Sequence, residues 1–189
     1  MPNLLRTFIA VPLPQEARTI IQEIQTDLQK CNCDISWVKP ENIHLTLKFL
    51  GDTASENIEA IKLIIKDCVR KTKPFDYTIN ELGAFPTLNK INVLWLGIDK
   101  NKDKFRAIVE MLEENLCRIG FPKENRSFSA HITLGRIRSN KNIHILKESL
   151  NKYKTPLNIP GNFSNITLFK STLTPTGPIY EVLDAVKFI

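Results

Sequence analysis

The hydrophobic positions along the chain follow two periods, one typical of helices and one typical of strands. From residue 15 to residue 30, apolar side chains recur every three or four positions, so Ala17, Ile20, Ile21, Ile24 and Leu28 share one helical face. The same spacing predicts helices over residues 56–71, with Leu63 on the buried face, 101–119 and 141–150. Runs rich in β-branched and aromatic residues predict strands over residues 4–11, 43–50, 75–82, 91–98, 130–137, 164–172 and 179–187.

The order of these elements predicts an α+β fold. Several neighbouring strands follow one another without a helix between them, which favours hairpins and an antiparallel or mixed sheet over a doubly wound parallel sheet. The turn-forming residues 174–178 separate the last two strands. Because no long linker or low-complexity stretch divides the chain, we expect residues 1–189 to form a single domain.

One short phrase occurs twice. His44-Leu45-Thr46-Leu47 returns as His131-Ile132-Thr133-Leu134, 87 residues further along a chain of 189. Since side chains at i and i+2 of a strand point to the same face, each phrase directs one imidazole and one hydroxyl in one direction. Each copy is also preceded and followed by a predicted helix, which indicates an internal duplication with two similar lobes facing each other across a groove.

Two imidazoles and two hydroxyls around one small anion suit acid–base chemistry at phosphorus. Imidazole titrates near neutral pH, so one histidine can accept a proton from water while the other donates a proton to a leaving oxygen. Threonine hydroxyls can donate hydrogen bonds to phosphoryl oxygens as their charge grows. The phrases carry no third Cys, Asp or Glu ligand, so we expect no metal. The third histidine, His144, has no threonine partner and is expected at the surface.

Composition indicates the kind of partner and the cellular compartment but does not identify a substrate. The net charge of +6 favours a polyanionic partner but is too moderate to require one. The four cysteines form no Cys-x-x-Cys pair, which favours ordinary reduced thiols. No signal segment or membrane-spanning apolar run is present, so we expect a cytoplasmic protein with no membrane partner.

The two phrases and their surroundings resemble the 2H phosphoesterase superfamily, in particular its RNA 2′,3′-cyclic phosphodiesterase branch, also called 2′-5′ RNA ligase-like. Residues 37–51 are similar to the first motif of that family, and residues 128–136 are similar to the second. Arg6-Thr7-Phe8-Ile9-Ala10 resembles the opening strand, and Ser171-Thr172-Leu173 with Gly177 and Tyr180 resembles the closing hairpin. One departure is Ala130, where the family usually has proline before the second histidine.

The resemblance implies a bilobal 2H fold, with two pseudo-symmetric lobes, outer helices and a central groove. It also implies hydrolysis of a terminal 2′,3′-cyclic phosphate on RNA, or of a cyclic nucleotide, to a 2′-phosphomonoester without a cofactor. In that reaction His131 is the proton acceptor, His44 is the proton donor, and Thr46 and Thr133 hold the non-bridging oxygens. Two alternatives stay open: 2′-5′ RNA ligation, which is the reverse reaction, and a non-catalytic module that binds RNA ends. We expect a monomer.

Further residues are candidates for substrate binding. Arg136 lies on the wrong strand face by parity, so the phosphate contact implied by the resemblance requires the strand to end or bulge after Thr133. Lys48 shares the face of His44 by parity and is expected to add charge to the groove. Candidates for stacking on a nucleobase are Phe8, Trp37 and Tyr180. The candidate track for the RNA backbone is Arg136, Arg138, Lys141 and Lys147.

Overall fold

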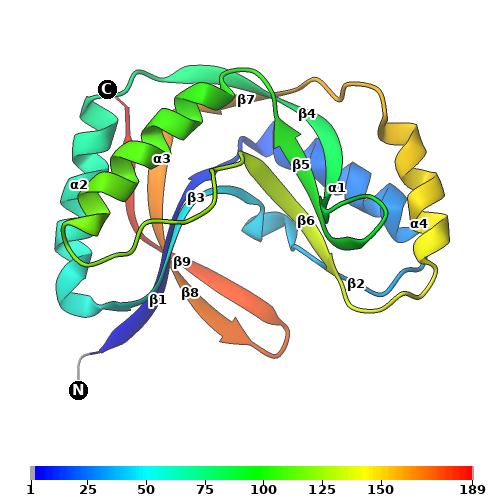
Figure 1. The fold of residues 1–189 in the computed structure, drawn as a ribbon, viewed down its shortest axis with the longest axis horizontal. Helices are drawn as coiled ribbons and strands as arrows, with labels where there is room; N and C mark the ends of the chain where they lie inside the picture. Colours follow the sequence, from blue (N-terminus) through cyan, green and yellow to red (C-terminus); the bar gives the residue numbers. More distant parts are fainter. Residues whose placement is uncertain (1–2, 189) are drawn as a thin grey trace.

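The structure, a computed structural model, describes residues 3–188 and arranges them as one curled antiparallel sheet with helices packed against one face (Figure 1). The strands are β1 (Leu4–Pro12), β2 (Ile35–Trp37), β3 (His44–Ala54), β4 (Phe75–Pro86), β5 (Ile91–Ile98), β6 (His131–Ile137), β7 (Ile159–Phe163), β8 (Asn165–Thr174) and β9 (Gly177–Lys187). The helices are α1 (Gln15–Gln29), α2 (Ile58–Arg70), α3 (Lys102–Cys117) and α4 (Ile143–Leu150), with short 3₁₀ turns at Pro40–Asn42, Ser55–Asn57 and Asn151–Tyr153.

The sheet consists of two halves that meet between the two motif-bearing strands. Its order is β7-β4-β5-β6-β3-β1-β8-β9, with β2 paired to β6. Outward from the seam, each half begins with a motif strand and continues with a strand from earlier in the chain, β5 beside β6 and β1 beside β3. One residue pair, Leu45 with Ile132, joins β3 to β6 in the described chain, so the halves splay apart on either side of it (Figure 1).

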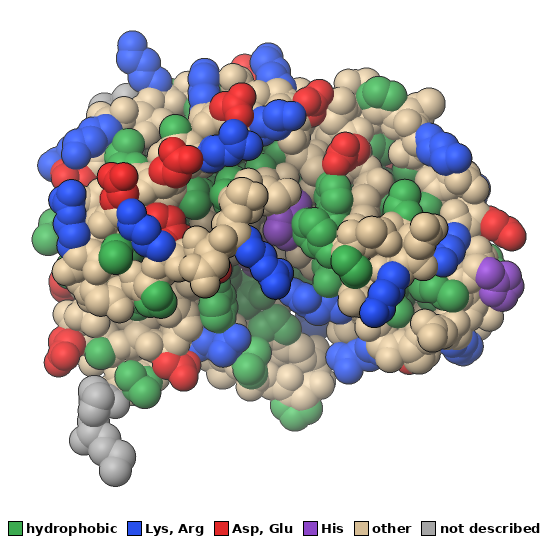
Figure 2. Space-filling view, viewed as in Figure 1, with side chains coloured by type: hydrophobic (Ala, Val, Ile, Leu, Met, Phe, Trp, Pro, Cys, Tyr) green, Lys and Arg blue, Asp and Glu red, His purple; other side chains and the backbone are tan. Residues whose placement is uncertain are grey.

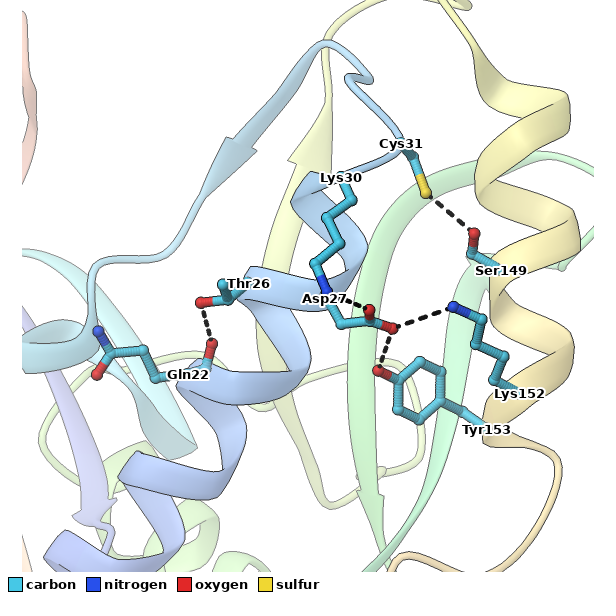
Figure 3. A network of polar contacts seen from close by, with 8 residues as sticks. All are labelled: Gln22, Thr26, Asp27, Lys30, Cys31, Ser149, Lys152 and Tyr153. Carbon is cyan, nitrogen blue, oxygen red and sulfur yellow. Dashed lines mark hydrogen bonds and ion pairs between the residues drawn. The ribbon is translucent and has the colours of Figure 1, made fainter.

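The helices cross over between the two halves. Helix α1 follows β1 but contacts β7 and α4 in the half that contains β6, whereas α3 follows β5 but contacts α2 and β3 in the other half. Polar contacts reinforce the junction of α1 with α4 and the turn after it (Figure 3). The Asp27 carboxylate accepts from the Tyr153 hydroxyl at 2.9 Å, and the Cys31 thiol donates to the Ser149 hydroxyl at 3.1 Å. The Lys30 and Tyr153 hydrogen bonds lower the pKa of Asp27.

The symmetric strand order and the crossed helices fit the expected pair of similar lobes. The α+β fold with an antiparallel sheet is confirmed. The single-domain boundary and the duplication stay predictions. Within residues 3–188, no helix has both the length and the apolar character needed to cross a membrane.

The structure corrects several details of the predicted elements. Ile20 is 37% exposed and Leu63 is 64% exposed, so both lie outside the buried faces of their helices. On α1 the buried face instead includes Gln25, whose side-chain amide donates to the backbone carbonyls of Val38 and Leu134. Strand β3 continues beyond residue 50 because Gly51 adopts a φ of 72°, which keeps the chain paired with β1 as far as Ala54.

Two strands escaped prediction. β2 has three residues, too few to show a period, and β7 contains Pro160 and Gly161, which normally mark breaks. β7 is an edge strand, so proline removes no hydrogen bond that the sheet needs. The hydrophobic core lies between the helices and the sheet face that carries Leu45 and Ile132, which leaves the opposite, concave face open.

Candidate active site

The seam between β3 and β6 brings the two repeated motifs together. Leu45 and Ile132 are paired across the seam and fully buried, so their side chains point into the core. The residues on either side of them must therefore project from the concave face, with His44 opposite Thr133 and Thr46 opposite His131. Directly opposed side chains of antiparallel strands have Cβ atoms about 5 Å apart, which is a suitable spacing for one phosphate.

Both imidazoles are oriented by a hydrogen bond to a backbone carbonyl two residues earlier in the chain. The Nδ1 atom of His44 lies 2.7 Å from the carbonyl oxygen of Asn42, and that of His131 lies 2.7 Å from the carbonyl oxygen of Ser129. Because a carbonyl only accepts, each Nδ1 carries the proton, and each Nε2 is left to exchange protons with substrate. The Nε2 atom of His44 is also 3.0 Å from the Thr46 hydroxyl.

The two rings lie in different surroundings. His44 packs against Phe8 at 4.9 Å, Tyr180 at 5.5 Å and Phe169 at 6.3 Å between ring centroids. Burial in this aromatic cluster lowers the pKa of His44, and the hydrogen bond to Asn42 opposes that effect in part. His131 instead meets the edge of Phe85 at 5.0 Å, with the Trp95 ring 6.4 Å away.

A β-bulge follows the motif in each lobe. In β6, Thr133 pairs with Trp95 but Gly135 pairs with Leu94, so Leu134 is the additional residue. The bulge that a groove-facing Arg136 requires after Thr133 is therefore present. It reverses the alternation, and Arg136 lines the cavity on the concave face.

The equivalent bulge in β3 overturns the expectation for Lys48. Thr46 pairs with Ala10 and Lys48 pairs with Ile9, which makes Leu47 the additional residue and turns Lys48 away from the groove. The Lys48 ammonium is buried instead, 2.8 Å from the carboxylate of Glu113 in α3, and it donates to the Pro122 carbonyl at 2.7 Å. Lys48 therefore adds no charge to the groove, and strand parity failed because it ignored the bulge.

A cavity of about 510 Å³ opens on the concave face beside the motifs. It is lined by both lobes and by the tip of the β8–β9 hairpin, including His44, Thr46, Thr133, Arg136, Trp37 and Tyr180. His131 stands just outside this lining, across the strand pair from Thr46. Four cationic side chains line the cavity (Arg6, Lys39, Arg136 and Arg138), and its described lining contains no Asp or Glu. The cavity is therefore suited to an anion.

The aromatic candidates differ in what they can offer a nucleobase. Trp37 and Tyr180 are partly exposed at the cavity, as stacking requires. Phe8 borders the cavity but is only 3% exposed, because its ring is enclosed by His44, Phe169 and Tyr180. The stacking expectation for Phe8 is therefore wrong, and this ring supports His44 instead.

Of the basic residues expected along the RNA track, two reach the cavity. Arg136 and Arg138 line it, while Lys147 donates to the Asn89 carbonyl at 2.7 Å, away from it. Lys141 does not line the cavity either. His144 is exposed on α4, as expected.

Several cavity residues were not predicted as site residues, and three of them bear on the site. Arg6 was noted only in the opening strand, although it lies two positions before Phe8. Phe49 lies 87 residues before Arg136, so the repeat itself could have identified it. Asn42 donates from its side chain to the Pro178 carbonyl at 2.8 Å, which ties the hairpin to the turn that holds His44.

Comparisons with known proteins agree with this architecture. The family described as LigT like Phosphoesterase matches twice, over residues 11–95 and 96–180. RNA 2′,3′-cyclic phosphodiesterase of Methanothermobacter thermautotrophicus is 32% identical, over 95% of this chain and 97% of its own length. The protein of the same name from Thermotoga maritima is 34% identical, over 97% of this chain and 96% of its own length.

Solved structures share the fold. TT0787 of Thermus thermophilus superimposes with a TM-score of 0.83 at 24% identity, covering 97% of this chain and 98% of its own. E. coli LigT in its apo form gives a TM-score of 0.76 at 25% identity, covering 97% of each chain. The resemblance to 2H phosphoesterases is thus confirmed. The expected enzyme class, cyclic phosphodiesterase, is also confirmed, since the curated relatives carry that name. The chain belongs to the LigT-like phosphoesterase family.

Proposed function

We propose that this protein hydrolyses the terminal 2′,3′-cyclic phosphate of RNA to a 2′-phosphomonoester by acid–base catalysis with two histidines. The observation that supports the proposal is the pairing of Leu45 with Ile132, from which we infer that two imidazoles and two threonine hydroxyls face one site on the concave face. The names of the curated relatives support the substrate class. The cavity supports an anionic ligand, because its described lining has four cationic side chains and no carboxylate.

In the proposed step, His131 removes a proton from water as the water oxygen forms a bond to phosphorus. The bond from phosphorus to the 3′ oxygen breaks, and that oxygen takes the proton from Nε2 of His44. Thr46, Thr133 and Arg136 hold the non-bridging oxygens, where negative charge grows in the transition state. The products are a 2′-phosphate and a free 3′-hydroxyl.

The different surroundings of the histidines support this division of roles. Burial disfavours the charged form of His44, so its imidazolium is a stronger acid toward the leaving oxygen. An anionic phosphate bound beside the ring attracts the positive charge and favours protonation while substrate is present. The register across the seam sets His131 opposite Thr46 and His44 opposite Thr133, so the two imidazoles lie on opposite strands, as attack and departure from opposite sides of the phosphate require.

The test is product analysis on a defined RNA oligonucleotide with a 2′,3′-cyclic phosphate end, in excess EDTA. We expect turnover to the 2′-phosphate. Loss of turnover with EDTA would contradict the metal-independent mechanism, and binding without turnover would identify a module that recognises RNA ends. Joining to an added 5′-hydroxyl RNA would identify ligation. The cytoplasmic location and the monomeric state stay predictions.

A further inference from the structure

Two equivalent positions in the lobes carry different side chains into the cavity. Phe49 and Arg136 are 87 residues apart, each follows the bulge of its motif strand, and both line the cavity. One lobe thus places a guanidinium where the other places a phenyl ring. Phe49 is 45% exposed, so its ring is open to contact from a neighbouring side chain or a ligand.

In the lobe that contains Phe49, the cation at the cavity comes from Arg6 of β1 instead. Its guanidinium carbon lies 4.7 Å from the centre of the Phe49 ring, which is a cation–π contact. A guanidinium in such a contact can still donate from its N–H groups to an anion. Within residues 3–188, no carboxylate lies within ion-pair distance of Arg6 or of Arg136. Both charges are therefore available to a ligand.

Arg6, Arg136 and Tyr180 line the same cavity, so the two guanidinium groups face one space. Burial raises the pKa of the Tyr180 phenol, and the positive charges of Arg136 and Arg6 oppose the rise. The residue lies on the hairpin wall of the cavity, beside the ring of His44. Lys and Arg side chains gather around the hollow in the middle of this face, next to a histidine (Figure 2). The site thus holds two separate guanidinium groups, one from each lobe.

We propose that Arg6 binds a second phosphate, namely the phosphodiester on the 5′ side of the terminal nucleotide. This inference rests on the proposed function, in which Arg136 and the two threonines hold the reacting phosphate. An RNA end offers one neighbouring anion on its 5′ side, whereas a nucleoside 2′,3′-cyclic phosphate offers none. Arg6 therefore makes the enzyme select RNA ends over cyclic mononucleotides.

The test compares three substrates: a nucleoside 2′,3′-cyclic phosphate, a dinucleotide with the same cyclic end, and that dinucleotide with an uncharged methylphosphonate linkage. In the wild-type protein, kcat/KM should be about tenfold higher for the charged dinucleotide than for the uncharged one, as for one charge-assisted hydrogen bond. Arg6→Gln should remove this difference while changing kcat/KM for the mononucleotide less than about twofold. Arg6→Lys should keep part of the difference, since it keeps the charge.

Two controls isolate the role of Arg6. Arg70→Gln removes an exposed charge on α2, outside the cavity, and should leave the substrate preference intact. The slope of log kcat/KM against log salt should become shallower by about 0.7 in Arg6→Gln, for the charged dinucleotide only. Retained thermal unfolding temperature and far-UV circular dichroism would show that each variant is folded.

Other outcomes would overturn the inference. If Arg6→Gln slows all three substrates equally, Arg6 serves the reacting phosphate. If Arg138→Gln removes the preference instead, the second phosphate binds at Arg138 and not at Arg6. If the wild-type protein does not distinguish the two linkages, there is no second phosphate contact. If the wild-type protein hydrolyses no cyclic phosphate at all, the proposed function is wrong. In the outcomes above the wild-type protein still hydrolyses the cyclic phosphate, so the two failures can be told apart.

Discussion

The two lobes carry the same four-residue motif in different settings. Each histidine is fixed by a carbonyl two residues earlier, at the same distance, and each motif strand bulges at the same position. Yet His44 lies among Phe8, Phe169 and Tyr180, where burial lowers its pKa, whereas His131 lies beside Phe85 and Trp95. A repeated local motif can therefore acquire two chemical roles from its surroundings alone.

The residue directly after the bulged leucine is also different in the two lobes. In one lobe it is Lys48, which forms a buried ion pair with α3. In the other it is Gly135, opposite Trp37 of β2. A Cβ atom on Gly135 would lie 2.7 Å from Ile35 and 3.2 Å from Trp37, so only glycine lets β2 approach this closely. The absence of a side chain here places Trp37 at the cavity.

The largest expected effect comes from removing either imidazole. His44→Ala and His131→Ala should each lower kcat for cyclic phosphate hydrolysis by about 10²–10⁴-fold, because each loses a general acid or base. Steady-state kinetics on a dinucleotide cyclic phosphate measures this loss. His144→Ala is the matched control, since that ring is exposed on α4, and it should keep the wild-type rate. A near-normal rate in either motif variant would refute its assigned role.

The next effect concerns stability in the lobe that contains Lys48. Lys48→Met leaves the Glu113 carboxylate buried without its partner and should reduce the free energy of unfolding by about 3–5 kcal/mol. Denaturant titration measures this change. Lys62→Met, which breaks an exposed pair with Glu59, should change the same quantity by less than about 1 kcal/mol. Equal effects of the two substitutions would show that burial of the Lys48 pair is energetically unimportant.

The threonines should reveal the asymmetry of the two motifs. Thr46→Val and Thr133→Val should each lower kcat by about 10²-fold, through loss of one hydrogen-bond donor to the transition state. Thr46 also contacts Nε2 of His44, so its substitution alone should move the pH dependence of kcat/KM. If both variants show the wild-type pH profile, the contact between Thr46 and His44 has no role in proton transfer.

The smallest effect is a change in the titration of His44. Burial predicts an imidazole pKa below the ordinary value of about 6.5, and Phe169→Ala should move it upward by admitting water to the ring. NMR titration of the ring protons measures both values. As the pH falls, the His44 imidazole is protonated in the unfolded chain at a higher pH than in the folded protein. Its contribution to the free energy of unfolding therefore decreases as the pH drops below about 6.5. A wild-type titration at or above the ordinary value would remove the physical basis for the different roles.

Much of the fold followed from local patterns. The helical stripe of α1, the two motif strands and the closing hairpin all lie within a few residues of their predicted ranges. The repeat also predicted that His44 and His131 would share a face, since the period of a strand fixes the direction of its side chains. The need for a bulge after Thr133 was deduced from the parity of Arg136 and was met.

The residues that were misplaced depend on partners distant in the sequence. Lys48 was assigned to the groove because nothing in its own strand signals the bulge, which is defined by the register with β1. Phe8 was expected to meet a base, but its neighbours Phe169 and Tyr180 come from the far end of the chain and enclose it. Arg6 acquired its place from a contact with Phe49 on the adjacent strand.

The sequence by itself determined the chemical groups of this protein: two imidazoles and two hydroxyls at strand spacing, repeated once. The tertiary structure alone decided how they differ, because burial, register shifts and the charge around each ring arise from side chains that only folding brings together. One lobe therefore has an imidazole with a depressed pKa and a buried ion pair at Lys48, and the other has an imidazole beside Phe85 and Trp95 and a glycine at the position equivalent to Lys48, although both begin from the same motif.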